Sequence, residues 1–133
     1  MTARASVQKL LETDSELISL GFGTVMASNS VDTPPANRFL IVKWNESTPA
    51  FKNVGPDSVQ IWAHDIDKDY TEINKALLRI RDVLTGAVHV EGEDGWTLTT
   101  SEWLGEGPDL YDPGYETCTR YADFTVVSRY TAS

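Results

Sequence analysis

The sequence predicts a single α+β domain over residues 1–133, in which a mostly antiparallel sheet of about four to five strands packs against two helices. A chain of 133 residues with 41% hydrophobic residues is long enough to bury one compact core. Segments of alternating apolar and polar residues predict the strands, and two stretches with an apolar repeat of 3.6 residues predict the helices. Clusters of glycine and proline separate these segments and predict loops.

The strongest local signal is a strand followed by a helix. Residues 59–64 alternate in polarity from one position to the next, which predicts a strand with two different faces. A helix is expected from about Tyr70 to Gly86, because apolar residues recur there at every third or fourth position. Asp69 and Glu72 have the spacing of a capping box, so we expect both to cap the first turn of this helix.

The other elements are predicted from shorter patterns. A first helix is expected with Ser6 as its N-cap and Gly21 at its end. The other strand candidates are residues 23–28, 38–44, 87–90, 96–104 and 120–129, and the loop candidates are residues 29–37, 45–58 and 105–117. Residues 87–90 and 96–104 together predict a hairpin. The strand 38–44 is apolar on both faces, which is typical of an interior strand or of one that meets a neighbouring subunit.

The negative charge is concentrated in one segment. The formal net charge is −9, and the segment from Asp82 to Thr119 contains no Lys or Arg. Its acidic residues are Asp82, Glu91, Glu93, Asp94, Glu102, Glu106, Asp109, Asp112 and Glu116. Binding to a phosphate backbone needs clustered cations, so a protein that grips nucleic acid is disfavoured. The segment is typical of a solvated, solubilising face, and it also fits a surface that repels DNA.

No motif indicates catalysis or a bound cofactor. His64-Asp65-x-Asp67 is the best potential metal or acid–base cluster, but its spacing matches no ligand motif with a known mechanism. We expect a structural turn whose carboxylates favour the start of the following helix, with no catalytic, cofactor-binding or metal site. The lone Cys118 is expected to be structural. The alternative of another class is a small metal- or ligand-binding domain on His64, Asp65 and His89.

Targeting signals and membrane segments are not expected. No run of residues approaches the ~20 apolar positions that a membrane-spanning helix needs, and the first twenty residues lack the apolar centre of a signal peptide. We therefore expect a soluble protein without a membrane partner.

Two segments resemble a known protein family. Residues 59–84 read as a strand, an H-D turn, D-Y and an I-x-x-A-L-x-x-I-R-x-x-L helix, and residues 120–129 read R-Y-A-D-F-T-V-V-S-R. This pattern resembles the tail terminator (tail-completion) proteins of long-tailed bacteriophages. The order of elements is also similar, with a helix first, two strands before the H-D turn and a long strand at the end.

The resemblance implies a non-enzymatic virion subunit that is assembled in the host cytoplasm. Family members form a homo-oligomeric ring, usually of six copies, at the head-proximal end of the tail tube, where they end tube growth and join the tail to the neck of the head. The partners implied are other copies of the chain, the major tail tube protein and the head–tail connector (stopper) protein. DNA would pass through the channel without specific binding. The alternative within phage biology is another head–tail connector subunit.

Candidate residues for assembly follow from this resemblance and from residue type. Aromatic side chains are favoured anchors in protein interfaces, and the interface candidates are Trp44, Trp62, Trp103, Tyr111 and Tyr115. The tryptophans also fit a core. A channel wall of carboxylates would avoid contacts with phosphate groups. The first candidates for the channel wall are Glu91, Glu93 and Asp94, and the second are Glu106, Asp109 and Asp112.

Overall fold

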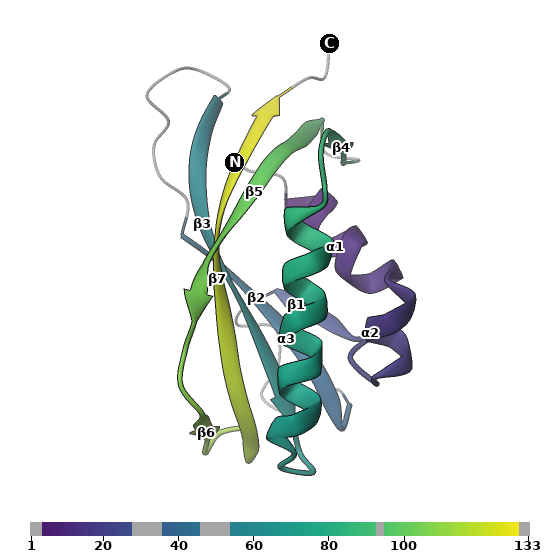
Figure 1. Ribbon diagram of the computed structural model, residues 1–133, viewed down its shortest axis with the longest axis vertical. Helices are drawn as coiled ribbons and strands as arrows, with labels where there is room; N and C mark the ends of the chain where they lie inside the picture. The colour runs from purple at the N-terminus through teal and green to yellow at the C-terminus, as the bar shows by residue number, and fades with distance from the viewer. Residues whose placement is uncertain (1–3, 28–35, 46–53, 93–94, 131–133) are drawn as a thin grey trace.

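One curled sheet with helices on one of its faces makes up the fold (Figure 1). The computed structural model describes residues 4–27, 36–45, 54–92 and 95–130. The described helices are α1 (Arg4–Thr13), α2 (Ser15–Ser19) and α3 (Tyr70–Thr85). The described strands are β1 (Val25–Ala27), β2 (Arg38–Asn45), β3 (Val54–Asp65), β4 (Val90–Glu91), β5 (Trp96–Glu106), β6 (Leu110–Asp112) and β7 (Thr117–Tyr130).

The sheet is almost entirely antiparallel. Its seven strands have the order β1-β2-β3-β7-β5-β4, and β6 pairs with β7. The pair β1 and β2 is parallel, and the other described pairs are antiparallel. The predicted α+β class with a mostly antiparallel sheet is therefore confirmed. The sheet has more strands than the expected four to five because β1, β4 and β6 have only two or three residues each, too few for a periodic signal.

The hydrophobic core lies between the sheet and the helices. Alternate side chains of the two central strands point into it, because successive residues of a strand face opposite sides of the sheet. The core includes Val59, Ile61 and Ala63 of β3, Ala122, Phe124 and Val126 of β7, and Ile73, Ala76, Leu77, Ile80 and Leu84 of α3. Full burial of a Leu, Ile or Phe side chain contributes about 1.5–3 kcal/mol. The predicted apolar stripe of α3 thus holds this helix on the sheet. Among the described residues, no helix is long and apolar enough to cross a membrane.

The expected first helix is divided into α1 and α2 by Asp14. The Asp14 backbone is extended, and its carboxylate caps α2 by accepting a hydrogen bond from Leu17 N at 3.1 Å. Arg79 of α3 donates to both carboxylate oxygens at 2.9 and 2.7 Å, and this pairing lowers the pKa of Asp14. The expectation that Ser6 is an N-cap is wrong. Ser6 is buried inside α1, where its hydroxyl donates to the Val90 carbonyl at 2.9 Å instead of serving its own helix.

α3 begins where the sequence predicts. Asp69 Oδ1 accepts hydrogen bonds from the backbone N–H groups of Thr71 at 2.9 Å and Glu72 at 3.4 Å. The Glu72 carboxylate lies 3.1 Å from Lys75 Nζ and 3.9 Å from Arg38 Nη1. Asp69 is therefore the N-cap. Glu72 forms ion pairs that link the first turn of α3 to its next turn and to β2.

The predicted loop 45–58 is wrong at its C-terminal end, where the structure has the first residues of β3. These residues pair with β7 on one side, and β2 reaches no further than Ser58 on the other. Pro56 therefore lies at an edge, where a residue without a backbone N–H is tolerated. Residues 46–53 of this predicted loop lie outside the described residues, as do most residues of the predicted loop 29–37.

The predicted loop 105–117 is also partly strand. β5 continues to Glu106, and β6 then pairs with the first residues of β7, so that β5 and β6 share one edge of β7. Gly107 lies in the turn between them, and a Cβ added there would come within 2.1 Å of the Tyr121 ring. The glycines and prolines of this segment mark its turns. Its strand pairing depends on contacts with β7, which are distant in sequence and give no local signal.

Replacing Asp69 with Ala should lower the free energy of unfolding by about 1 kcal/mol, because two backbone N–H groups of α3 lose their acceptor. Urea unfolding followed by circular dichroism measures this change. Asp67→Ala is the matched control, since Asp67 is an exposed carboxylate in the same turn and α3 does not begin on it. Equal losses in the two variants would contradict the capping role.

Candidate functional site

The side of the sheet that faces away from the helices is only partly covered, and we call it the outer face. Its side chains alternate with those that enter the core. They include Phe39, Ile41 and Lys43 of β2, Gln60, Trp62 and His64 of β3, and Thr119, Tyr121 and Asp123 of β7. The helices of the fold leave the outer face without a covering layer, which makes it a candidate for a functional site.

One end of the outer face is covered by the segment 110–116, which consists of β6 and the residues that join it to β7. The Phe39 and His64 rings are stacked there, with their centroids 4.7 Å apart and an angle of 3° between their planes. The Tyr115 ring meets both edge-on, at centroid distances of 5.2 and 5.5 Å. His64 Nδ1 lies 2.7 Å from the Thr117 hydroxyl oxygen. These contacts cover the first part of β2 on the outer face, while Lys43 and Asn45 at its other end are exposed.

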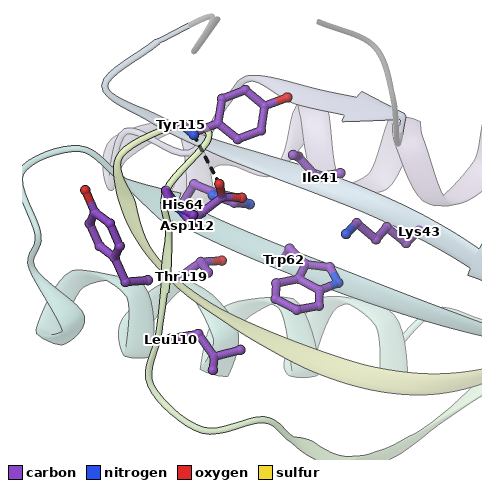
Figure 2. A pocket seen from close by; sticks show the side chains of 10 residues that line it. Ile41, Lys43, Trp62, His64, Leu110, Asp112, Tyr115 and Thr119 are labelled. Carbon is purple, nitrogen blue, oxygen red and sulfur yellow. Dashed lines mark hydrogen bonds between the residues drawn. The ribbon is translucent and has the colours of Figure 1, made fainter. Parts of the chain in front are cut away.

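A cleft of about 600 Å³ remains beside this covered end (Figure 2). Figure 2 shows Trp62 and Lys43 on neighbouring strands, with Tyr115 and Asp112 on the segment that borders the cleft. Lys43 Nζ lies 4.6 Å from the centroid of the Trp62 ring. The Trp62 ring also contacts Tyr121, at a centroid distance of 4.5 Å. The cleft thus offers aromatic surface with a cation over it, which suits contact with another protein better than covalent chemistry.

His64 is a neutral, structural side chain at physiological pH. Its side chain is only 2% exposed, and this burial lowers its pKa to about 4. The carboxylate of Asp112 opposes this shift, whereas the ammonium group of Lys43 adds to it. His64 therefore contributes a stacked ring and a hydrogen bond in its neutral form near neutral pH.

The H-D-x-D turn does not gather its side chains at one point. His64 faces the outer side of β3, whereas the next residue, Asp65, faces the helix side and is fully buried. Asp65 accepts hydrogen bonds from Arg38 Nε at 3.2 Å and from the backbone N–H of Asp67 at 2.8 Å. His89 lies beyond the opposite end of α3. Within the described ranges, no group of three or more His, Cys, Asp and Glu side chains is placed to hold a metal ion.

The five interface candidates lie in four places. Trp44 and Trp103 lie near the two opposite edges of the sheet, and both are partly buried against the core. Trp62 lies in the middle of the outer face. Tyr111 and Tyr115 belong to the segment at the covered end, where Tyr111 is half exposed. Their role in assembly stays a prediction.

The candidates for the channel wall do not form one surface. Glu91 is on β4, while Glu106 and Asp109 lie near β6, at the other end of the long axis of the molecule (Figure 1). Arg120 Nη2 lies 3.4 Å from Glu106, and its Nε lies 3.3 Å from Asp109, so part of this negative charge is neutralised. The Asp112 carboxylate accepts backbone hydrogen bonds within its own turn. Glu93 and Asp94 lie outside the described residues. Which of these acids faces a channel stays a prediction.

Two features of the outer face were missed from sequence. The stack of His64 on Phe39 and the position of Lys43 over Trp62 both join residues of neighbouring strands, and strand pairing is not visible in a single sequence. The alternation of Tyr121, Asp123 and Thr125 with core residues in the last strand was the available signal, since it is typical of a half-exposed face.

Comparisons with known proteins add a likeness of fold. No protein-family model and no curated protein sequence matches this chain. Among solved structures, a chain described as part of the "Virion of native gene transfer agent (GTA) particle" is similar, with a TM-score of 0.67 and 18% sequence identity. The likeness covers 98% of this chain and 96% of that chain. The α+β fold described above therefore also occurs, over nearly its whole length, in a protein of that particle.

The depressed pKa of His64 makes stability depend on pH in a defined window. Between pH 6.5 and about 4 the His64 imidazole is protonated in the unfolded chain and neutral in the folded chain. Protonation therefore favours the unfolded state, and the free energy of unfolding falls as the pH falls. The loss from this group should reach roughly 3 kcal/mol at about pH 4. Urea unfolding at a series of pH values measures it. His64→Phe keeps a stacking ring without the titration and should show a flatter profile, and identical slopes for both proteins would contradict this account.

Proposed function

We propose that this chain is a structural, non-enzymatic subunit of a phage or phage-like virion. The observation that carries the proposal is the likeness of fold to a chain of a gene transfer agent virion, which extends over 98% of this chain and 96% of that chain. At 18% identity the likeness establishes the fold. The virion role rests on that likeness together with the sequence resemblance to tail terminator proteins.

Within the virion, the position we propose is the head-proximal end of the tail tube. The two segments that resemble tail terminator proteins, residues 59–84 and 120–129, are far apart in the sequence. In the fold they form one unit, because β3 pairs with β7 along its whole length and α3 covers this pair. Two matching segments that pack together support a shared structure better than matching segments that lie apart in the fold would. The proposed assembly is a closed homo-oligomeric ring, with six copies expected, that caps the tube and meets the connector.

The placement of cations fits a ring around a DNA channel. Several described bases are already engaged within the chain: Arg38 with Asp65, Arg79 with Asp14, Arg120 with Glu106, and Arg81 over the Trp103 ring. A protein that holds DNA needs clustered cations that are free to meet phosphate groups. The engaged bases and the net charge of −9 instead favour DNA that passes without being held.

Cryo-electron microscopy of particles that contain this chain tests the proposal. We expect a closed ring of identical copies at the end of the tail tube next to the head, because a heterologous contact that closes makes a ring rather than a filament. A ring one layer nearer the head would assign the chain to the connector instead. A position in the capsid shell, at the distal tip of the tail or outside the particle would contradict the proposed cap.

A further inference from the structure

The sheet has two open edges among the described residues. At one edge, β1 pairs only with Leu40–Val42 of β2, so Lys43–Asn45 have no described strand beyond them. At the other edge, β4 pairs only with Thr97 and Leu98 of β5, so Thr100–Glu106 have none. An open edge presents backbone N–H and C=O groups with which another strand can pair.

The outer-face side chains of the two edges are complementary in charge. Lys43 is exposed at the β2 edge, and Glu102 is exposed at the β5 edge. The segment Asp82–Thr119, which contains β5, has no Lys or Arg. Two β5 edges would therefore repel each other, because like charges on paired strands are destabilising. A β5 edge and a β2 edge attract each other, and this difference selects between the two pairings.

On the helix side, each edge carries a partly buried tryptophan with an arginine over its ring. The Arg4 guanidinium lies 5.6 Å from the centroid of the Trp44 ring, and that of Arg81 lies 3.9 Å from the Trp103 ring. Both tryptophans pack against the core. Aromatic pairs stabilise neighbouring strands, and Trp and Arg are enriched where interfaces gain most of their energy.

The strand directions also fit a contact between copies in a ring. Three antiparallel pairings separate β2 from β5, so β5 runs opposite to β2. A rotation about an axis close to the strand direction, applied from one copy to the next, leaves the directions of the strands unchanged. β5 of one copy would therefore meet β2 of the next in antiparallel orientation. A contact between two different surfaces closes into a ring when the rotation closes.

We propose that the partner of these edges is a second copy of this chain, with β5 of one copy paired to Lys43–Asn45 of the next and Trp103 opposite Trp44. In this register Glu102 lies diagonal to Lys43 on the outer face, within reach of these long side chains. The sheet then continues from copy to copy. This inference rests on the proposed function, because it names the surfaces through which the proposed ring closes.

Crosslinking of variants that each carry one introduced cysteine tests the pairing. Cys118 is the only cysteine of the chain and is buried, so introduced cysteines report their own contacts. One preparation carries Asn45→Cys and another carries Leu104→Cys, a side chain that is 56% exposed at the β5 edge. A short bis-maleimide should give crosslinked dimers in the mixture of the two and not in either alone. Leu78→Cys, on the exposed side of α3, replaces Leu104→Cys as the control and should give none.

Charge reversal then tests the complementarity of the edges. Glu102→Lys in the Leu104→Cys preparation should reduce the crosslinked fraction about tenfold, since it sets two cations side by side. Lys43→Glu in the Asn45→Cys preparation should restore the crosslinks when it is combined with Glu102→Lys. Asp67→Lys, away from both edges, should leave them unchanged.

The outcomes for the pairing and for the proposed function are distinct. Absence of the crosslinked dimer from the mixture, or dimers from either variant alone, overturns the edge pairing even if particles show a ring at the tail end. Crosslinks in the mixture from a chain that is not at the tail end overturn the tail position and leave the pairing as a contact between copies.

Discussion

The pairing of β3 with β7 is the interaction on which the rest of the structure depends. It runs from Val54 opposite Arg129 to Asp65 opposite Cys118 without a register shift. Because side chains alternate along each strand, this register decides which residues enter the core under α3 and which reach the outer face. A slip by one residue would exchange the two sets and expose the core. The core, the outer face and both edges of the sheet therefore follow from one ladder of backbone hydrogen bonds.

The elements that the sequence predicts well are those with a long, local periodic signal. The strand 59–64, the helix from Tyr70 and the last strand each carry such a signal, and the structure contains all three. The same signal could not reveal that Pro56 lies within a strand or that β6 pairs with β7, because both depend on partners far away in the sequence. Ser6 shows the same limit, since a residue suited to cap a helix serves a distant carbonyl instead.

For the candidate site, too, the sequence predicted some features and missed others. Residue type alone suggested tryptophans as contact residues, and the structure adds that Trp44 and Trp103 lie near opposite edges of the sheet. The H-D-x-D turn, which had the composition of a small site, distributes its side chains over two faces of β3 because neighbouring strand residues point in opposite directions. Residue type thus suggested the candidates, and the pairing of strands determined where each of them lies.

The proposed ring consists of several identical copies of this chain in a virion. Quantitative mass spectrometry of purified particles, calibrated with a labelled standard of this 14.7 kDa chain, measures the copy number directly. We expect a small fixed number of copies per particle, six for a ring that caps a tube. A single copy per particle, or a number large enough to build a shell or a whole tube, would contradict the ring.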